Sequence, residues 1–296
     1  STTGTTTMKL GANGVGIYVN NGSASNDGKI EMTSGKINAV GMYTKKGTVT
    51  NNGTIEVGDS TQLGMVAVTN SGIVINNGTI DLKSQGAAGI VGKDGAVITN
   101  NNTGTIQFNT TKAFGIAADN ATVNLGLATM TLANSGENIY VYAKNGSTVN
   151  VNGNLDIDGV ADAGTKKSVG IYLDGTNTFT NNAIIKAENS AVGIYVNGVN
   201  TLNNGTYTSE GDKTVGIYFA DGGTLASATV NSGSLTGNSV GIYGAAGNIN
   251  LSGGLTLNIG TFGGATFGTG IYLADGAGVS GGTITVTNNS SNANIG

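Results

Sequence analysis

The chain has 296 residues, a net charge of −4 and a pI near 4.7, with 52 Gly and no Pro, Cys, Trp or His. Without Cys there are no disulfides or thiolate metal sites, and without His there is no Ser-His-Asp triad. Every basic residue is Lys and no basic run occurs, which argues against a nucleic-acid partner. The regular spacing of the apolar residues predicts a folded chain.

A three-residue box, Gly-Ile-Tyr, recurs along the whole chain and defines its repeat. The distance between successive boxes is 23 to 32 residues, and a period of 20–50 residues indicates a solenoid, a propeller or an array. Complete boxes begin at Gly16, Gly170, Gly193, Gly216, Gly241 and Gly270, and degenerate ones at Gly41, Gly64, Gly89, Gly115 and Asn138.

One repeat, Val15 to Val40, illustrates the unit. Residues 15–19 alternate like a strand, which predicts Val15, Ile17 and Val19 on one face. Asn and Gly turns follow, then a second short strand around Ile30 and Met32. No stretch has helical periodicity of useful length.

A second box, Asn-Asn-Gly-Thr-Ile, follows the first in many repeats, with close copies beginning at Asn51, Asn76 and Asn203. A third short strand lies between the boxes, for example at 48–50, 97–99 and 148–150. Asn residues at equivalent turns are expected to stack into side-chain amide ladders, and we assign these boxes a structural role rather than ligand binding.

Strands and turns in units of about 25 residues predict an all-β fold, a right-handed parallel β-helix (β-solenoid) of about 11 coils. A left-handed helix needs hexapeptide phasing, which is absent, and a propeller blade needs about 40–45 residues. We expect residues 1–296 to form a single solenoid segment of a longer chain, because open sheet edges at both ends need further coils or a cap.

The box tyrosines form the first candidate binding surface. If the box Ile faces inward, strand alternation turns the Tyr outward, and stacked coils carry a stripe of rings. Such a stripe either binds sugars or proteins or simply stabilises the sheet, as cross-strand aromatic pairs do. Val66, Val91 and Ala117 divide it in two. The predicted members are Tyr18, Tyr43, Tyr140, Tyr172, Tyr195, Tyr218, Tyr243 and Tyr272.

The longest step between boxes supplies a second candidate, because solenoid insertions form loops on one side, where binding sites often lie. Its charged residues are Asp156, Asp158, Asp162, Lys166 and Lys167. Oxygen ligands near Gly159 could hold Ca²⁺, but the spacing matches no known calcium loop. A solvated loop is the simpler interpretation, and we expect no metal and no cofactor. The step from Gly241 to Gly270, with Phe262 and Phe267, is a third candidate surface.

An enzymatic function is the alternative, because some parallel β-helices act on polysaccharides. Such sites need clustered carboxylates, often with Arg, Lys or His in a groove. Here the 17 acidic residues are scattered. The sequence therefore favours a non-enzyme.

The boxes as they stand at Ser168–Tyr172, Ala191–Tyr195 and Ser239–Tyr243, followed by Asn-Asn-Gly-Thr-Ile, resemble the passenger regions of large fusobacterial autotransporter adhesins, of the arginine-inhibitable or galactose-sensitive type. The resemblance covers nearly the whole chain. It implies secretion to the bacterial surface and attachment to proteins or glycans of other bacteria or host cells. It also implies contact with the membrane only through a C-terminal barrel outside this chain. No binding motif is carried over from the family. Nothing resembles a coiled coil or a trimer motif, so we expect a monomer.

Overall fold

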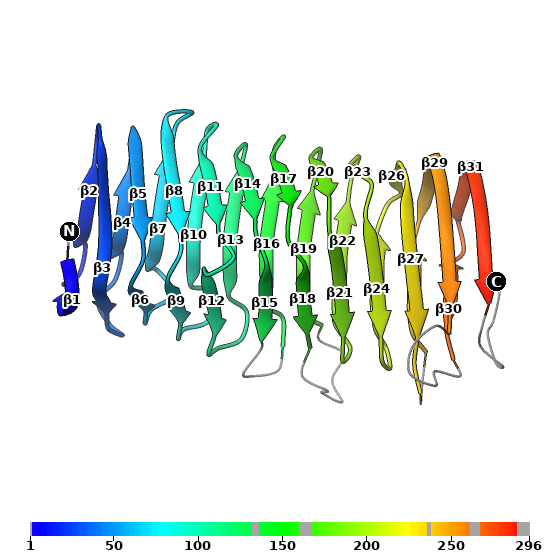
Figure 1. The fold of residues 1–296 in the computed structure, drawn as a ribbon, viewed down its shortest axis with the longest axis horizontal. Helices are drawn as coiled ribbons and strands as arrows, with labels where there is room; N and C mark the ends of the chain where they lie inside the picture. Colours follow the sequence, from blue (N-terminus) through cyan, green and yellow to red (C-terminus); the bar gives the residue numbers. More distant parts are fainter. Residues whose placement is uncertain (1, 132–135, 160–166, 236–237, 261–266, 289–296) are drawn as a thin grey trace.

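A computed structural model describes residues 2–131, 136–159, 167–235, 238–260 and 267–288. The secondary structure of these ranges consists of strands, without a helix. It follows that none of the described segments has the length and hydrophobicity of a membrane-spanning helix. The coils stack side by side along one axis as a right-handed parallel β-helix of about ten turns, which confirms the predicted fold (Figure 1).

The box strands form one sheet of eleven strands, each paired in parallel with the strands of the coils before and after it. We call it the box sheet. Its strands, in order, are β2 (Val15–Val19), β4 (Val40–Thr44), β7 (Leu63–Val68), β10 (Ala88–Lys93), β13 (Phe114–Asp119), β16 (Ile139–Lys144), β19 (Val169–Asp174), β22 (Val192–Asn197), β25 (Val215–Phe219), β28 (Val240–Gly244) and β30 (Thr269–Leu273).

Two further columns of strands complete each coil, and four long strands belong to the same 20-stranded sheet. The second column contains β5 (Gly47–Asn51), β8 (Gly72–Asn76), β11 (Val97–Asn100), β14 (Thr122–Leu125), β17 (Thr148–Val151), β20 (Thr178–Asn181), β23 (Thr201–Asn203) and β26 (Gly223–Leu225). The third column contains β6 (Thr54–Val57), β9 (Thr79–Leu82), β12 (Thr105–Phe108), β15 (Ala128–Thr131), β18 (Leu155–Asp158), β21 (Ile184–Glu188), β24 (Thr206–Glu210) and β27 (Ala228–Gly233). The long strands are β1 (Thr2–Lys9), β3 (Ser23–Met32), β29 (Gly247–Ile259) and β31 (Ala277–Asn288).

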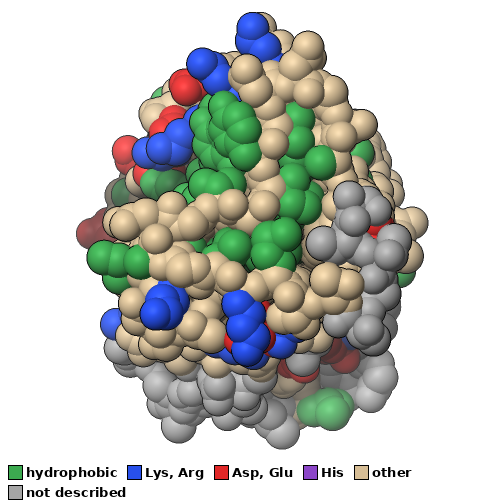
Figure 2. Space-filling model, turned by 90° about the vertical axis from the view of Figure 1, so that its left-hand side faces the viewer, with side chains coloured by type: hydrophobic (Ala, Val, Ile, Leu, Met, Phe, Trp, Pro, Cys, Tyr) green, Lys and Arg blue, Asp and Glu red, His purple; other side chains and the backbone are tan. Residues whose placement is uncertain are grey.

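The core lies inside the coils and consists of columns of like residues. Met42, Met65 and Ile90 follow one another on the box sheet, and Ile55 and Ile80 do so on the third column, all fully buried. Burying each such side chain contributes about 1.5–3 kcal/mol relative to exposure. Figure 2, which faces the N-terminal end of the rod, shows hydrophobic side chains open to view at this end.

Two asparagine ladders run along the turn between the second and third columns, as the Asn-Asn-Gly boxes predict. In the buried ladder the Nδ2 of Asn26 donates to Oδ1 of Asn51 (2.8 Å), Asn51 to Asn76 (2.9 Å) and Asn76 to Asn100 (2.8 Å). The second ladder, made by the exposed neighbours of these residues, comprises Asn52, Asn77 and Asn101. An amide can repeat in this way because it carries both a donor and an acceptor.

Asn51→Ala should destabilise the protein much more than Asn52→Ala. The first leaves the buried acceptor of Asn76 without this partner, at about 1–3 kcal/mol for an unsatisfied group, and removes the shortest of the hydrogen bonds that the buried amide of Asn26 donates. The second breaks the same kind of bond where water can replace it. Urea unfolding of the two variants measures the difference. Equal midpoints would contradict a structural role for the buried ladder.

The first residue of each box strand corrects a prediction. Val15 was expected to face inward with Ile17 and Val19, yet its side chain is 45% exposed. The cause is the box glycine, because Gly16 and Ile17 both face the core and the residue before them therefore turns outward. A Cβ on Gly16 would lie 2.6 Å from the carbonyl oxygen of Gly41 and against core side chains, so only glycine fits.

Gly193→Ala should destabilise the coil, because its Cβ would lie 2.5 Å from the carbonyl oxygen of Gly216 in the next coil. Overpacking of this kind costs about 1–3 kcal/mol or more. Gly254→Ala is the matched control, because nothing lies within 4 Å of its added Cβ. Thermal unfolding should show a clear loss for the first and a small change for the second; the reverse order would show that the close approach is not what selects glycine.

Candidate functional site

A column of tyrosines lies on the outer face of the box sheet. Neighbouring ring centroids are 4.7 Å apart for Tyr172–Tyr195, 4.8 Å for Tyr195–Tyr218, 4.9 Å for Tyr218–Tyr243 and 5.0 Å for Tyr243–Tyr272. Their planes differ by only 5–19°. Tyr18 and Tyr43 stack in the same way at 5.5 Å near the N-terminal end. The predicted stripe and its division into two parts are therefore present.

Stacking determines what the stripe can offer a ligand. Each ring inside the stack has a neighbour on both faces, so a partner meets ring edges and hydroxyl groups. A sugar that packs on an aromatic residue needs a free ring face, as does a cation over a ring. Between Tyr172 and Tyr243 the stack therefore presents a ridge of hydroxyls above apolar edges rather than a series of platforms.

Tyr140 does not belong to the stripe, contrary to the prediction. Its side chain is 1% exposed and packs on Phe108, with ring centroids 6.3 Å apart. Its hydroxyl accepts a hydrogen bond from Nδ2 of Asn100 (3.1 Å), so Tyr140 ends the buried ladder. Strand β16 pairs with β19 through Val141↔Ile171 and Tyr142↔Tyr172, so the stripe residue of this coil is Tyr142, two positions later.

Tyr142 joins the stripe with a different ring orientation. Its ring is tilted by 47° to Tyr172 and lies edge-on to Phe114 at 64°. Its hydroxyl donates to Oδ2 of Asp174 (2.7 Å), which holds the ring in this position. Burial, followed by this hydrogen bond, raises the pKa of Tyr142 to about 12.

A groove runs beside the tyrosines along the rod. The first residues of the box strands, Val169, Val192 and Val215, turn outward and pack against the rings of Tyr172, Tyr195 and Tyr218. The groove between and above these two columns has a volume of about 760 Å³. Its walls are apolar, and its polar groups are the tyrosine hydroxyls and the side chains at its rim.

Charged residues occupy the rim of the groove. Lys112 and Glu137 form an ion pair (3.5 Å), and the Nζ of Lys167 donates to the carbonyl oxygen of Lys213. Burial, reinforced by the charge of Lys213, lowers the pKa of Lys167. Lys112, Glu137 and Lys213 adopt positive φ (56°, 62° and 57°), where the first coils have Asn13 and Asn38. A long charged residue costs about 1–2 kcal/mol more than Gly in this conformation, so the rim carries charge at some expense of stability.

The stripe has a gap where Val66, Val91 and Ala117 replace tyrosine. Val66 and Val91 form a separate, partly exposed apolar cluster with Tyr43, Phe114 and Ala117. At its C-terminal side, between Val91 and Tyr142, lies a pocket of about 270 Å³. We call it the gap pocket. Lys93, Asp119 and Lys144 form its polar side.

The charged loop candidates are divided between two surfaces. Asp156 and Asp158 lie on strand β18, where Asp158 accepts a hydrogen bond from Asn189 (2.6 Å). Burial, followed by the charge of Glu188, raises the pKa of Asp156. Lys167 instead lies at the groove. Asp162, Lys166 and Phe262 fall outside the described residues. Phe267 is described, and its backbone pairs with Ser234.

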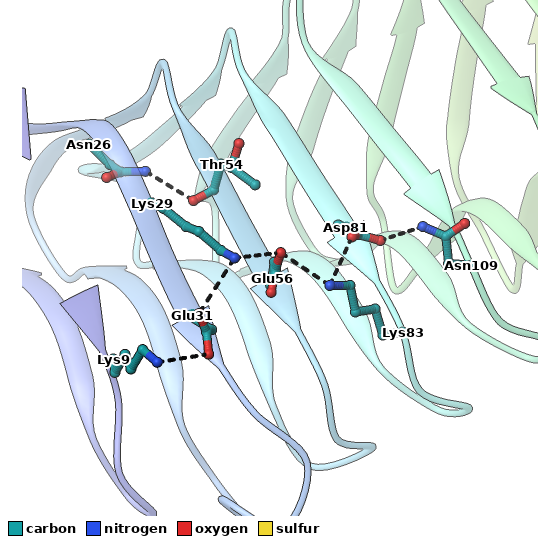
Figure 3. A network of polar contacts seen from close by, with 9 residues as sticks. All are labelled: Lys9, Asn26, Lys29, Glu31, Thr54, Glu56, Asp81, Lys83 and Asn109. Carbon is teal, nitrogen blue, oxygen red and sulfur yellow. Dashed lines mark hydrogen bonds and ion pairs between the residues drawn. The ribbon is translucent and has the colours of Figure 1, made fainter. Parts of the chain in front are cut away.

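In the first coils the stacked carboxylates Glu31, Glu56 and Asp81 are neutralised by lysines (Figure 3). The Nζ of Lys29 lies 3.4 Å from Glu31 and 2.8 Å from Glu56, and that of Lys83 lies 3.1 Å from Glu56 and 3.4 Å from Asp81. Burial pushes the pKa of Glu56 upward, but the hydrogen bonds from both lysines outweigh it and lower this pKa. Within the described ranges no group of three or more carboxylates is placed to hold a metal ion.

The sequence reasoning missed the valine column, the charged rim and Tyr142. The valine column had a visible signal, because the residue before the box Gly is apolar in nearly every copy. The shifted register of β16 also had a visible signal. The triplet Tyr140-Val141-Tyr142 matches the Gly-Ile-Tyr box in its last two positions, with an apolar residue before a tyrosine, but it lacks the glycine.

Comparison with known proteins gives one family match. The model of the third pectate lyase-like domain of BigA matches residues 1–104, which is about a third of the chain. No curated protein and no solved structure matches the chain. The matched residues are the first coils, which contain Tyr18, Tyr43 and the lysines and carboxylates drawn in Figure 3, and this part of the chain is similar to that domain.

The phenol of Tyr142 should ionise about two pH units above an ordinary tyrosine. The folded-state pKa, about 12, lies above the unfolded value of 10.0, so the stability from this group is complete below pH 10 and is lost as the pH rises through 12. The difference between absorbance titrations of the wild type and Tyr142→Phe isolates this residue. Asp174→Asn should shift the midpoint down. A difference curve centred near 10 would contradict the buried, hydrogen-bonded position.

Proposed function

We propose that this chain is a non-catalytic segment of the surface-exposed passenger of a large bacterial adhesin, of the fusobacterial autotransporter type, which attaches the cell to proteins or glycans of other bacteria or host cells. The observation that carries the proposal is the groove beside the stacked tyrosines, which combines apolar walls, a ridge of hydroxyls and a charged rim. The β-helical fold and the match to the BigA domain support this class of protein.

The stacked coils supply the mechanical part of this function. Nearly every described coil contacts its neighbours through three parallel pairings, so the rod displays its side chains at a regular spacing. The costly left-handed lysines and glutamate at the rim favour a contact surface over a simple spacer.

A polysaccharide-active enzyme is the second candidate, because the matched family is described as pectate lyase-like. In the matched region Glu31, Glu56 and Asp81 stack in one column, but lysines neutralise them. Their geometry favours a structural role. Release of reducing ends or unsaturated products from uronate or galactan polymers would overturn the non-catalytic proposal.

The proposal is tested by binding the labelled chain to partner bacteria and host cells, with free sugars or arginine as competitors. We expect saturable attachment that Tyr195→Phe and Tyr218→Phe each weaken by about 2- to 10-fold, since each removes a hydroxyl but keeps the stack. Lys46→Gln, on an exposed turn away from the groove, is the control. Absence of attachment by the folded chain would contradict an adhesive role for this segment.

A further inference from the structure

The ring faces of the stripe are open where the stack ends or is interrupted. Inside the stack each ring is covered by its neighbours at 4.7–5.0 Å. At the gap, the coil of Ala117 presents a methyl group where the coils of Tyr172 and Tyr195 present a ring. The coil beside Tyr142 therefore has the apolar surface on which the stripe lies, but Ala117 contributes no ring to cover it.

The gap pocket occupies this position. Val91, Ala117 and Ala118 form its floor, and Phe114 and Tyr142 form an aromatic wall. Its volume, about 270 Å³, lies just below the range of about 300–1,000 Å³ typical of drug-sized ligands, so it suits a single ring. The hydroxyl of Tyr142 is already bonded to Asp174, which fixes the wall before a ligand arrives.

The charged side chains of the pocket determine which charge a ligand should carry. Asp119 is paired with Lys144 (3.2 Å) and accepts a hydrogen bond from Asn145 (2.7 Å). Lys93 projects from the same row, directly beside Asp119 in the strand register, and has no ion-pair partner within 4 Å in the described part of the chain. The charged side chains that line the pocket are thus two lysines and one carboxylate, and Asp174, which follows Lys144 in the row, is occupied by the hydroxyl of Tyr142.

We propose that the gap pocket binds one pyranose ring that bears a carboxylate, with the ring against Tyr142 over Ala117 and the carboxylate at Lys93. A ring with an apolar face, polar edges and one negative charge matches the floor, the wall and the charged row together. An aromatic side chain of a protein partner would fill the apolar part but would leave Lys93 and the Asp119–Lys144 pair without a counterpart. The inference deepens the proposed function and rests on it for its biological meaning.

Ligand-observed NMR titration tests the proposal with methyl β-D-glucuronide and the methyl glycoside of N-acetylneuraminate, which represent two sources of the same chemistry. Methyl β-D-glucopyranoside is the matched neutral probe. We expect a Kd of about 1 mM for at least one acidic probe, the order that a single ring reaches, and at least tenfold weaker binding of the neutral one. Equal binding of the acidic and neutral sugars, or binding of neither at 20 times this concentration (about 20 mM), would overturn the proposal.

Three variants locate the site. Ala117→Tyr extends the stack into the pocket and should abolish binding while the thermal midpoint stays at or above that of the wild type. Lys93→Gln should weaken binding of the acidic probe at least tenfold. Ala117→Ser leaves the pocket open and should retain binding. Unchanged binding in Lys93→Gln or in a folded Ala117→Tyr would contradict the assignment.

Further outcomes distinguish this inference from an aromatic-ligand site and from the proposed adhesive function. If N-acetyltyrosinamide binds in place of both acidic sugars and Ala117→Tyr abolishes that binding, the pocket takes an aromatic side chain and the sugar assignment is wrong. If the acidic sugars fail to bind while the chain still attaches to cells, only this inference fails. Binding of the sugars without cell attachment would sustain the pocket and contradict the proposed function.

Discussion

In-register parallel pairing of every coil with the next is the constraint on which the rest of the structure depends. It places equivalent residues of successive coils one strand spacing apart, about 4.8 Å. Any side chain that repeats must therefore tolerate its own copy as its nearest neighbour. Amides, phenol rings and aliphatic side chains do so, and they form the Asn ladders, the tyrosine stripe and the core columns. Carboxylates repel their own copies, and Glu31, Glu56 and Asp81, which are register partners, are accordingly bridged by Lys29 and Lys83.

The same constraint explains how much was predictable. The Gly-Ile-Tyr and Asn-Asn-Gly motifs recur about once per coil. Their spacing therefore predicts the fold, the strands, the buried amides and most of the stripe. Tyr140 and Val15 were misplaced for two reasons, a strict alternation of faces for Val15 and a misassigned register for Tyr140. The glycine allows two consecutive residues to face the core, which reverses the face of the residue before it. In β16 the register moves by two residues and exchanges Tyr140 for Tyr142.

The groove was less predictable than the stripe beside it, because its parts are distant in the repeat. The valines lie three residues before the tyrosines, and the rim comes from the preceding turn, whose composition varies from Asn13 to Lys112 and Glu137. Periodicity identifies what repeats, whereas recognition depends on what differs between coils. The gap pocket exists because the coils of Val91 and Ala117 lack the ring that the following coil has in Tyr142.

The two Asn ladders run in opposite directions along the rod. In the buried ladder each amide donates toward the C-terminal end, from Asn26 onward, and the last bond reaches the hydroxyl of Tyr140. In the exposed ladder the donors point the other way, from Asn101 back to Asn52, whose amide ends on the carboxylate of Asp27. The side-chain dipoles of the two rows therefore oppose one another. Further coils of this kind lengthen both rows equally, so the rod can grow without these amides building up a field along its axis.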